Sequence, residues 1–245
     1  MLPTVGADSV KIIRYSAEVA GRVMGIAAMT NLVPEATRRA ALTQCGNAIL
    51  TVNQALLTAF FARIQFESID QRVSFGKGKG IDRGFDAVVA TISESVRTSL
   101  ADRHTSNPDY RAIFPNGTEE MTSPTIREDE AIAEELRSAL AASNLTVKSD
   151  ALALIDTAVP VIGPAATALR NAEQHLNGLF QAELNARKDV VDALWEQRKI
   201  VETQLGRAGK ALARFVFFDF RKAGESETAT PAPPETGNTP PAVGG

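Results

Sequence analysis

Residues 40–62 read AALTQCGNAILTVNQALLTAFFA and contain no charged side chain, although Arg38, Arg39 and Arg63 flank them. Apolar side chains recur in this stretch at steps of three and four, which is the period of an α-helix. A solvated helix face normally carries lysine and glutamate, because both favour helix and stay hydrated. We therefore predict a helix that is covered on most sides, and with it an all-α fold.

The predicted helix has two unlike faces. The apolar face consists of Leu42, Cys45, Ile49, Val52, Leu56 and Phe60, and the opposite face is an uncharged polar stripe of Gln44, Asn47, Thr51, Gln54 and Thr58. A buried amide without a partner costs about 1–3 kcal/mol. Three interpretations of the stripe stay open: a solvent face, a seam against another helix or subunit, and the lining of a small-molecule cavity.

Helix signals continue on both sides of this stretch. Asp8 and Ser9 predict the start of a helix that ends near Met29, and the uncharged helix should run from Pro34–Glu35 to about Asp70. The glycines of residues 75–80 predict a flexible break, followed by a helix from Arg83 to Ala101. The chain should thus form an antiparallel bundle of about six to seven helices.

The second part of the chain shows a similar order of signals. After an irregular connector, a helix is expected from Thr125 to Leu140, and a helical pattern punctuated by Pro160, Gly163 and Pro164 reaches Phe220. We divide the chain into an N-terminal helical half (1–103), a connector (104–124), a C-terminal helical half (125–222) and a disordered Pro/Thr-rich tail (223–245). Two related halves from a duplication, or two hairpins that merely share a layout, both fit this order.

The connector carries the one resemblance to other proteins. Residues 111–117, Arg-Ala-Ile-Phe-Pro-Asn-Gly, join the two halves. They resemble a Phe-Pro-Asp/Asn-Gly connector in uncharacterised bacterial helical proteins of similar length. The resemblance covers about the middle third of the chain and implies a helical bundle of two related halves. It brings no activity and no functional residues.

Charge and cysteine content narrow the classes of partner and compartment. A net charge of −3 does not predict a nucleic-acid partner. Cys45 is the single cysteine, which excludes a disulfide framework and fits a reducing compartment, and no signal peptide is recognisable at Met1, so we expect a cytoplasmic protein. Residues 40–62 have the length of a membrane span, but their amides and hydroxyls argue against a stable one.

Catalytic and metal-binding patterns are missing from the sequence. His104 and His175 are the two histidines, and neither stands in a Glu-x-x-His or His-Glu-x-x-His motif. Cys45 has apolar neighbours in mid-helix, which suits a core residue better than a nucleophile. We expect no catalytic residues, no metal and no cofactor, and we lean against an enzyme.

Two further segments are candidates for binding. Lys77, Lys79 and Arg83 flank glycines before an expected helix start, where free backbone N–H groups attract anions, although a solvated turn explains them as well. The cluster of Phe215, Phe217, Phe218 and Phe220 either meets a partner or wraps a buried terminus. The sequence favours a non-enzymatic interaction or assembly protein, with a protein partner or a homo-oligomer; the alternative is a small-molecule-binding helical bundle.

Overall fold

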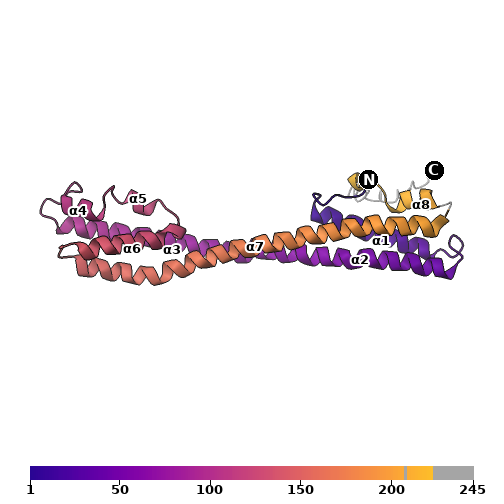
Figure 1. Ribbon diagram of the computed structural model, residues 1–245, viewed down its shortest axis with the longest axis horizontal. Coiled ribbons are helices and arrows are strands. Elements are labelled where there is room, and N and C mark those ends of the chain that lie inside the picture. The colour runs from indigo at the N-terminus through magenta and orange to yellow at the C-terminus, as the bar shows by residue number, and fades with distance from the viewer. Residues whose placement is uncertain (207–208, 223–245) are drawn as a thin grey trace, which may run out of the picture. The chain divides into compact units, whose positions relative to one another are not determined.

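The computed structural model describes residues 1–206 and 209–222, and it contains helices and connecting segments with no strand among them (Figure 1). The predicted all-α fold is confirmed. The expected disordered tail, residues 223–245, lies outside the described residues. The chain divides into two compact units: unit 1 comprises Met1–Phe60 and Ala182–Gly245, and unit 2 comprises Phe61–Gln181. Each unit therefore takes residues from both sides of the connector.

Unit 1 is built from helices at both ends of the chain. It contains α1 (Ser9–Ala28), most of α2 (Ala36–Gln65), the second part of α7 (Lys148–Leu205), and α8 (Gly209–Val216). The start of α1 lies where the sequence predicts it, because the Asp8 carboxylate accepts a hydrogen bond from the Lys11 amide at 3.0 Å. A short 3-10 helix, Phe220–Lys222, follows α8.

The core of unit 1 joins α1, α2 and α7. Its fully buried side chains include Ile12, Tyr15, Val19, Leu42, Ile49, Leu56, Val190 and Leu194. Gly46 lets α2 approach α1, since a Cβ at this position would lie 2.5 Å from Met24 Cγ and 3.2 Å from the Ala20 carbonyl oxygen. The close approach explains why a glycine stands in the middle of a long helix.

Unit 2 is built around α3 (Gln71–Ser99), α6 (Ile126–Ala142) and the first part of α7. A five-residue π-helix, Phe66–Asp70, joins α2 to α3, and the connector contains the short helices α4 (Pro108–Ile113) and α5 (Glu119–Thr122). The predicted start of α6 is confirmed, and the Glu128 carboxylate accepts a hydrogen bond from the Thr125 amide at 3.3 Å. Figure 1 shows α3, α6 and α7 of this unit running alongside one another.

The predicted break at residues 75–80 is wrong, because α3 runs through all of its glycines. A glycine in a helix costs about 0.5–1 kcal/mol relative to alanine. Packing outweighs that cost here: Phe85 is buried, Phe75 and Ile81 pack on the unit 2 core, and Gly78 lies under Leu169 and Ile126. No proline and no asparagine interrupt the stretch, so nothing but the glycines opposes the helix.

Helix α7 is continuous for 58 residues and contains Pro160 and Pro164 in its interior. The sequence marked these prolines as interruptions, and the helix nevertheless continues through them. Helices α2–α3 (Ala36–Ser99) and α7 (Lys148–Leu205) are long and apolar enough to cross a membrane by length and composition. In each, 28% of the most apolar 18-residue stretch is buried inside the protein.

Candidate helix-pairing surface

The two faces of α2 separate as the sequence predicts. Leu42, Cys45, Ile49 and Leu56 are at most 2% exposed, Val52 is half-buried against the same core, and Phe60 is half-buried. The opposite polar stripe, Gln44, Asn47, Thr51, Gln54 and Thr58, is exposed along its whole length. The expectation that the helix is covered on most sides is therefore not met by residues 1–206 and 209–222, which cover one face of α2 and leave the other open.

Small side chains accompany the stripe. Ala48 and Ala55 are exposed beside it, and so is Leu50 at 36%. The hydroxyls of Thr51 and Thr58 donate to the carbonyl oxygens of Asn47 and Gln54, at 3.0 and 2.9 Å. Because these hydroxyls are bonded within the helix, the threonines need no further acceptor. The side chains of the stripe that can still bond a partner are therefore the three exposed amides, Gln44, Asn47 and Gln54.

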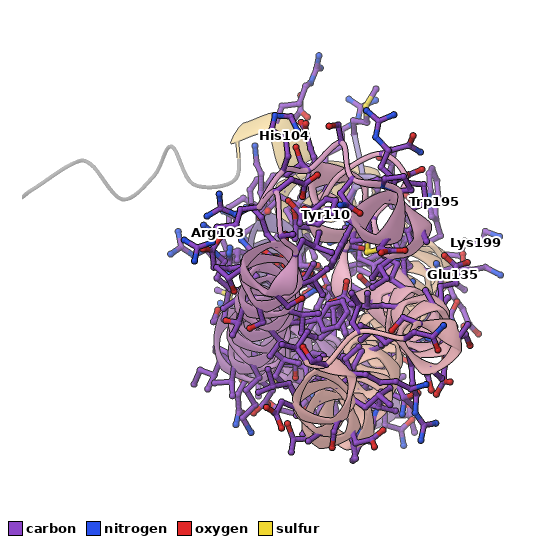
Figure 2. The ribbon with its side chains drawn as sticks, turned by 90° about the vertical axis from the view of Figure 1, so that its left-hand side faces the viewer. Arg103, His104, Tyr110, Glu135, Trp195 and Lys199 are labelled. Atoms are coloured by element: carbon purple, nitrogen blue, oxygen red, sulfur yellow. The ribbon has the colours of Figure 1, made fainter. Side chains whose placement is uncertain are left out.

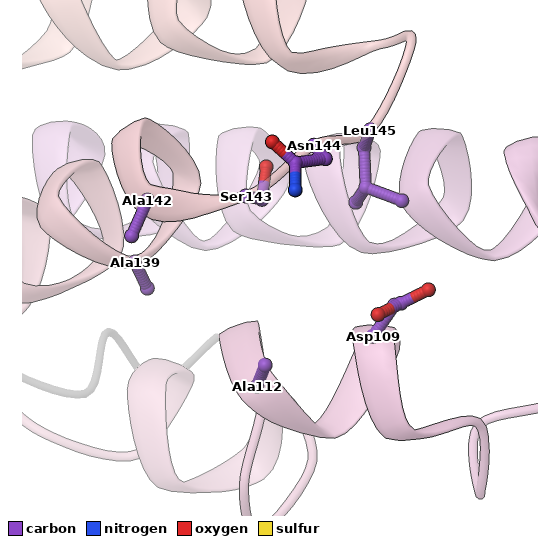
Figure 3. Close-up of a pocket in the computed structure, with 7 residues that line it drawn as sticks. All are labelled: Asp109, Ala112, Ala139, Ala142, Ser143, Asn144 and Leu145. Carbon is purple, nitrogen blue, oxygen red and sulfur yellow. The ribbon is translucent and has the colours of Figure 1, made fainter.

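None of three cavities among the described residues is lined by the stripe. A cavity of about 280 Å³ lies between α4 and the end of α6, where Asp109 and Ala112 face Ala139, Ser143 and Asn144 (Figure 3). A second, of about 450 Å³, lies between α3 and α7 in unit 2. A third, of about 100 Å³, lies by Leu32 and Leu205 in unit 1. A cavity lined by the stripe thus has no counterpart among them.

The phenylalanine cluster lies mostly against α1. Phe217 is 4% exposed, and Phe218 and Phe220 pack on the Tyr15 ring with centroid distances of 4.9 and 5.3 Å. Tyr15 donates its hydroxyl hydrogen bond to the Phe218 carbonyl at 2.9 Å. Phe215 is 57% exposed and lies under the Arg22 guanidinium, 4.8 Å from the ring centroid.

The three candidate anion-binding cations all lie on α3. Lys77, Lys79 and Arg83 are exposed, and Arg83 pairs with Asp86 at 3.2 Å. Their backbone amides lie in the interior of the helix, so the free N–H groups that the sequence hypothesis requires are not there. Any anion held by these lysines would meet side chains alone.

The residues with catalytic potential lie apart from one another. Figure 2 shows Arg103 and His104 on the outside, in the loop after α3, and His104 Nδ1 lies 2.7 Å from Ser106 Oγ. His175 packs edge-on against Phe66 at 4.6 Å. Burial raises the pKa of the Cys45 thiol, which opposes the thiolate that a nucleophile needs. No group of three His, Cys, Asp or Glu side chains within the described residues could hold a metal ion.

Sequence reasoning missed a buried polar cluster in unit 1. Ser9 and Glu183 are at most 1% exposed, and the Ser9 hydroxyl donates to Glu183 Oε1 at 2.5 Å. Arg187 Nε donates to Ser9 Oγ at 2.6 Å, and Arg187 also pairs with Glu183. The spacing of Glu183 and Arg187 by four residues was visible in the sequence, but their burial was not. The cluster ties the start of α1 to α7 and offers a substrate no access.

A second missed feature is a buried carboxyl in unit 2. Asp129, in the first turn of α6, is 2% exposed, and its Oδ2 has no hydrogen-bond partner among the described residues. Burial raises its pKa to about 7, and the like charges of Asp82, Asp86 and Glu128 act in the same direction. The acid-rich start of α6 reads as a solvated face in the sequence, and Asp129 departs from that reading.

Comparisons of the chain with protein-family models, with curated proteins and with solved structures found no match.

Proposed function

We propose that this protein is a non-enzymatic assembly protein that pairs with a second copy of itself through the stripe face of α2. The observation that carries the proposal is an exposed helix face that extends from Gln44 to Thr58 with no charged residue. A helix that faces only solvent usually carries charge. Uncharged amides between small residues are typical of helix seams, where they select register.

The stripe is self-complementary when two copies run antiparallel about Thr51. Gln44 of one copy then faces Thr58 of the other, Asn47 faces Ala55, and Gln54 faces Ala48. Each large amide side chain meets a small one, as packed helices require. No like charges oppose each other anywhere in this seam. A parallel arrangement would instead place each amide against its own counterpart.

The size of the surface limits the strength of the pairing. The stripe spans four helical turns, roughly 21 Å. A stable interface buries at least about 1,000 Å² in total, and a single helix pair reaches that only with flanking contacts. We expect a concentration-dependent dimer with a dissociation constant on the order of 10 μM.

The test uses the full chain in sedimentation equilibrium over a range of concentrations. Thr51→Arg places two like charges at the centre of the seam, and so does Thr51→Glu, so each variant should be monomeric. A mixture of the two should dimerise again, because opposite charges then meet. Thr203→Arg is the matched control, since Thr203 is an exposed α7 threonine with the same bond to a carbonyl four residues back.

Cysteine cross-linking tests the direction of pairing. Gln44→Cys and Thr58→Cys should cross-link when mixed, and each alone should cross-link weakly. Efficient cross-linking of each variant with itself would show parallel pairing. A wild-type chain that stays monomeric at every concentration would refute the proposal.

A further inference from the structure

A half-open groove in unit 2 lies between α3 and the proline-containing part of α7. Its volume is about 450 Å³, within the range of small-molecule sites. Most of its wall is apolar, formed by Gly78 and Ile81 from α3 and by Pro160, Val161 and Pro164 from α7. Val161 is 49% exposed, so part of this apolar wall faces solvent.

The groove has one charged group among the described residues that line it, the Lys77 side chain. Lys77 is exposed, and no ion pair of Lys77 occurs within residues 1–206 and 209–222. Ser74, which also lines the groove, already donates its hydroxyl hydrogen bond to the Asp70 carbonyl at 3.0 Å. The site thus combines an apolar trough with one unpaired cation at its rim.

Small residues and prolines keep the trough open and apolar. Ala165, Ala168 and Gly78 leave space where larger side chains would fill it. Pro160 and Pro164 have no backbone N–H, so they present ring carbons and no donor. A ligand with several polar groups would find few partners in such a wall, whereas an alkyl chain needs none.

We propose that this groove binds a single-chain anionic amphiphile of the long-chain fatty acid class. The alkyl chain lies along Pro160, Val161 and Pro164, and the carboxylate pairs with the Lys77 ammonium. Burial of the chain supplies most of the affinity, and the ion pair at the rim fixes the orientation. The inference uses unit 2 residues alone and is independent of the dimer proposed above.

Calorimetric titration of the full chain with palmitate, below its critical micelle concentration, tests this proposal. Palmitate should bind, and hexadecyltrimethylammonium, which has a saturated chain of nearly the same length and the opposite charge, should bind at least tenfold more weakly. Lys77→Glu should weaken palmitate binding about tenfold. Lys79→Glu is the matched control: it makes the same change of charge two residues away, outside the groove lining, and should alter affinity less than twofold.

Two further measurements do not depend on the folding of the Lys77→Glu and Lys79→Glu variants. Ala168→Phe fills the trough and should abolish binding while the helical circular dichroism is retained. On the wild-type chain, spin-labelled stearate should broaden the Val161 methyl and Gly78 amide signals. Equal losses in Lys77→Glu and Lys79→Glu, broadening elsewhere, or binding only to anionic phospholipid vesicles would each overturn the assignment.

Discussion

Asp129 shows how one side chain makes a helical unit sensitive to pH. Its carboxyl is buried, its Oδ2 has no hydrogen-bond partner in the described part of the chain, and the half-buried Asp82 and Asp86 of α3 add negative charge nearby. In the unfolded chain the carboxyl titrates at its ordinary value of 3.8, and in the fold at about 7. The folded state therefore holds a proton that the unfolded state has already released.

Stability should consequently fall as the pH rises from about 4 to about 7, and level off above that range. Asp129→Asn removes the titrating group and should stabilise the protein by about 2 kcal/mol at pH 8, with little effect at pH 4. Urea unfolding at the two pH values measures the difference. Asp109→Asn, at an exposed position of α4, is the control and should leave the free energy of unfolding unchanged at both pH values. An equal effect of Asp129→Asn at both pH values would contradict the argument.

Glu183 presents the opposite case, a buried carboxylate with partners. It accepts from Ser9 and pairs with Arg187 inside unit 1. Removing one member of a buried network leaves the others without compensation. Ser9→Ala should therefore destabilise the protein by about 1–3 kcal/mol. Ser95→Ala is the control, because the half-buried Ser95 donates an exposed hydrogen bond to the Thr91 carbonyl of its own helix and bonds no other element among the described residues. Equal unfolding midpoints for the two variants would refute a stabilising role for the cluster.

At the scale of the element, helix α3 carries exposed glycines that no contact explains. Gly76, Gly80 and Gly84 are exposed and helical, and a Cβ added at any of them would meet nothing within 4 Å. Each glycine-to-alanine substitution should stabilise the protein by about 0.5–1 kcal/mol, since alanine loses less backbone entropy on folding.

Gly117→Ala provides a control with the opposite expected sign. A Cβ there also has open space, but Gly117 has a φ of +86°, which strains any other residue. We expect a loss of about 1 kcal/mol. Thermal unfolding of the four single variants shows whether each substitution raises or lowers the melting temperature. Destabilisation by all three α3 substitutions would indicate that this helix face is in contact with something in solution.

The helices also show which parts of the fold can be predicted from local sequence signals. The start of α1 at Asp8 and of α6 at Thr125 follow from local capping, and the apolar face of α2 follows from its period. The error at residues 75–80 has a different origin, because the helix there packs on residues far away in the sequence, such as Ile126 and Leu169 beside Gly78. The prolines of α7 were likewise read as interruptions from local rules, but the buried side chains of Ile155, Ile162 and Ala166 hold this part of the helix against the unit 2 core.

The candidate sites could likewise be predicted from the sequence only in part. The stripe of α2 was visible as a pattern, but its exposure depends on where α1 and α7 lie. The groove at Lys77 joins residues more than 80 positions apart, and no local signal connects Lys77 with Pro160. Asp129 belonged to an apparently ordinary acidic helix start, and its burial is a property of the packed unit.

At the scale of the whole molecule, the two ends of the described chain meet in unit 1. The Phe220 amide donates to the Met1 carbonyl at 2.9 Å, and the Met1 ammonium lies 3.6 Å from the Asp219 carboxylate. Phe217 and the neighbouring Val216 are buried in the unit 1 core and hold this segment in place. Contacts of residues 217–220 therefore stabilise the N-terminal segment and α1.

Phe217→Ala should lower the stability of unit 1 by about 3–4 kcal/mol, because it removes a buried ring and leaves a cavity. Trp195, the single tryptophan, belongs to unit 1, so its fluorescence follows this unit. Phe215→Ala is the control, since that ring is 57% exposed and should contribute little. Similar fluorescence midpoints for the two variants would contradict the assigned role of Phe217.

The division of the chain also sets an order of events during synthesis. Unit 2 is one continuous segment, Phe61–Gln181, whereas unit 1 needs residues from Ala182 onward. At about 5–20 residues per second, the ribosome takes roughly 6–24 s to make a segment of that length. For this time the apolar faces of α1 and α2 have no partner from α7. They depend on each other, or on chaperones, until the last helices emerge.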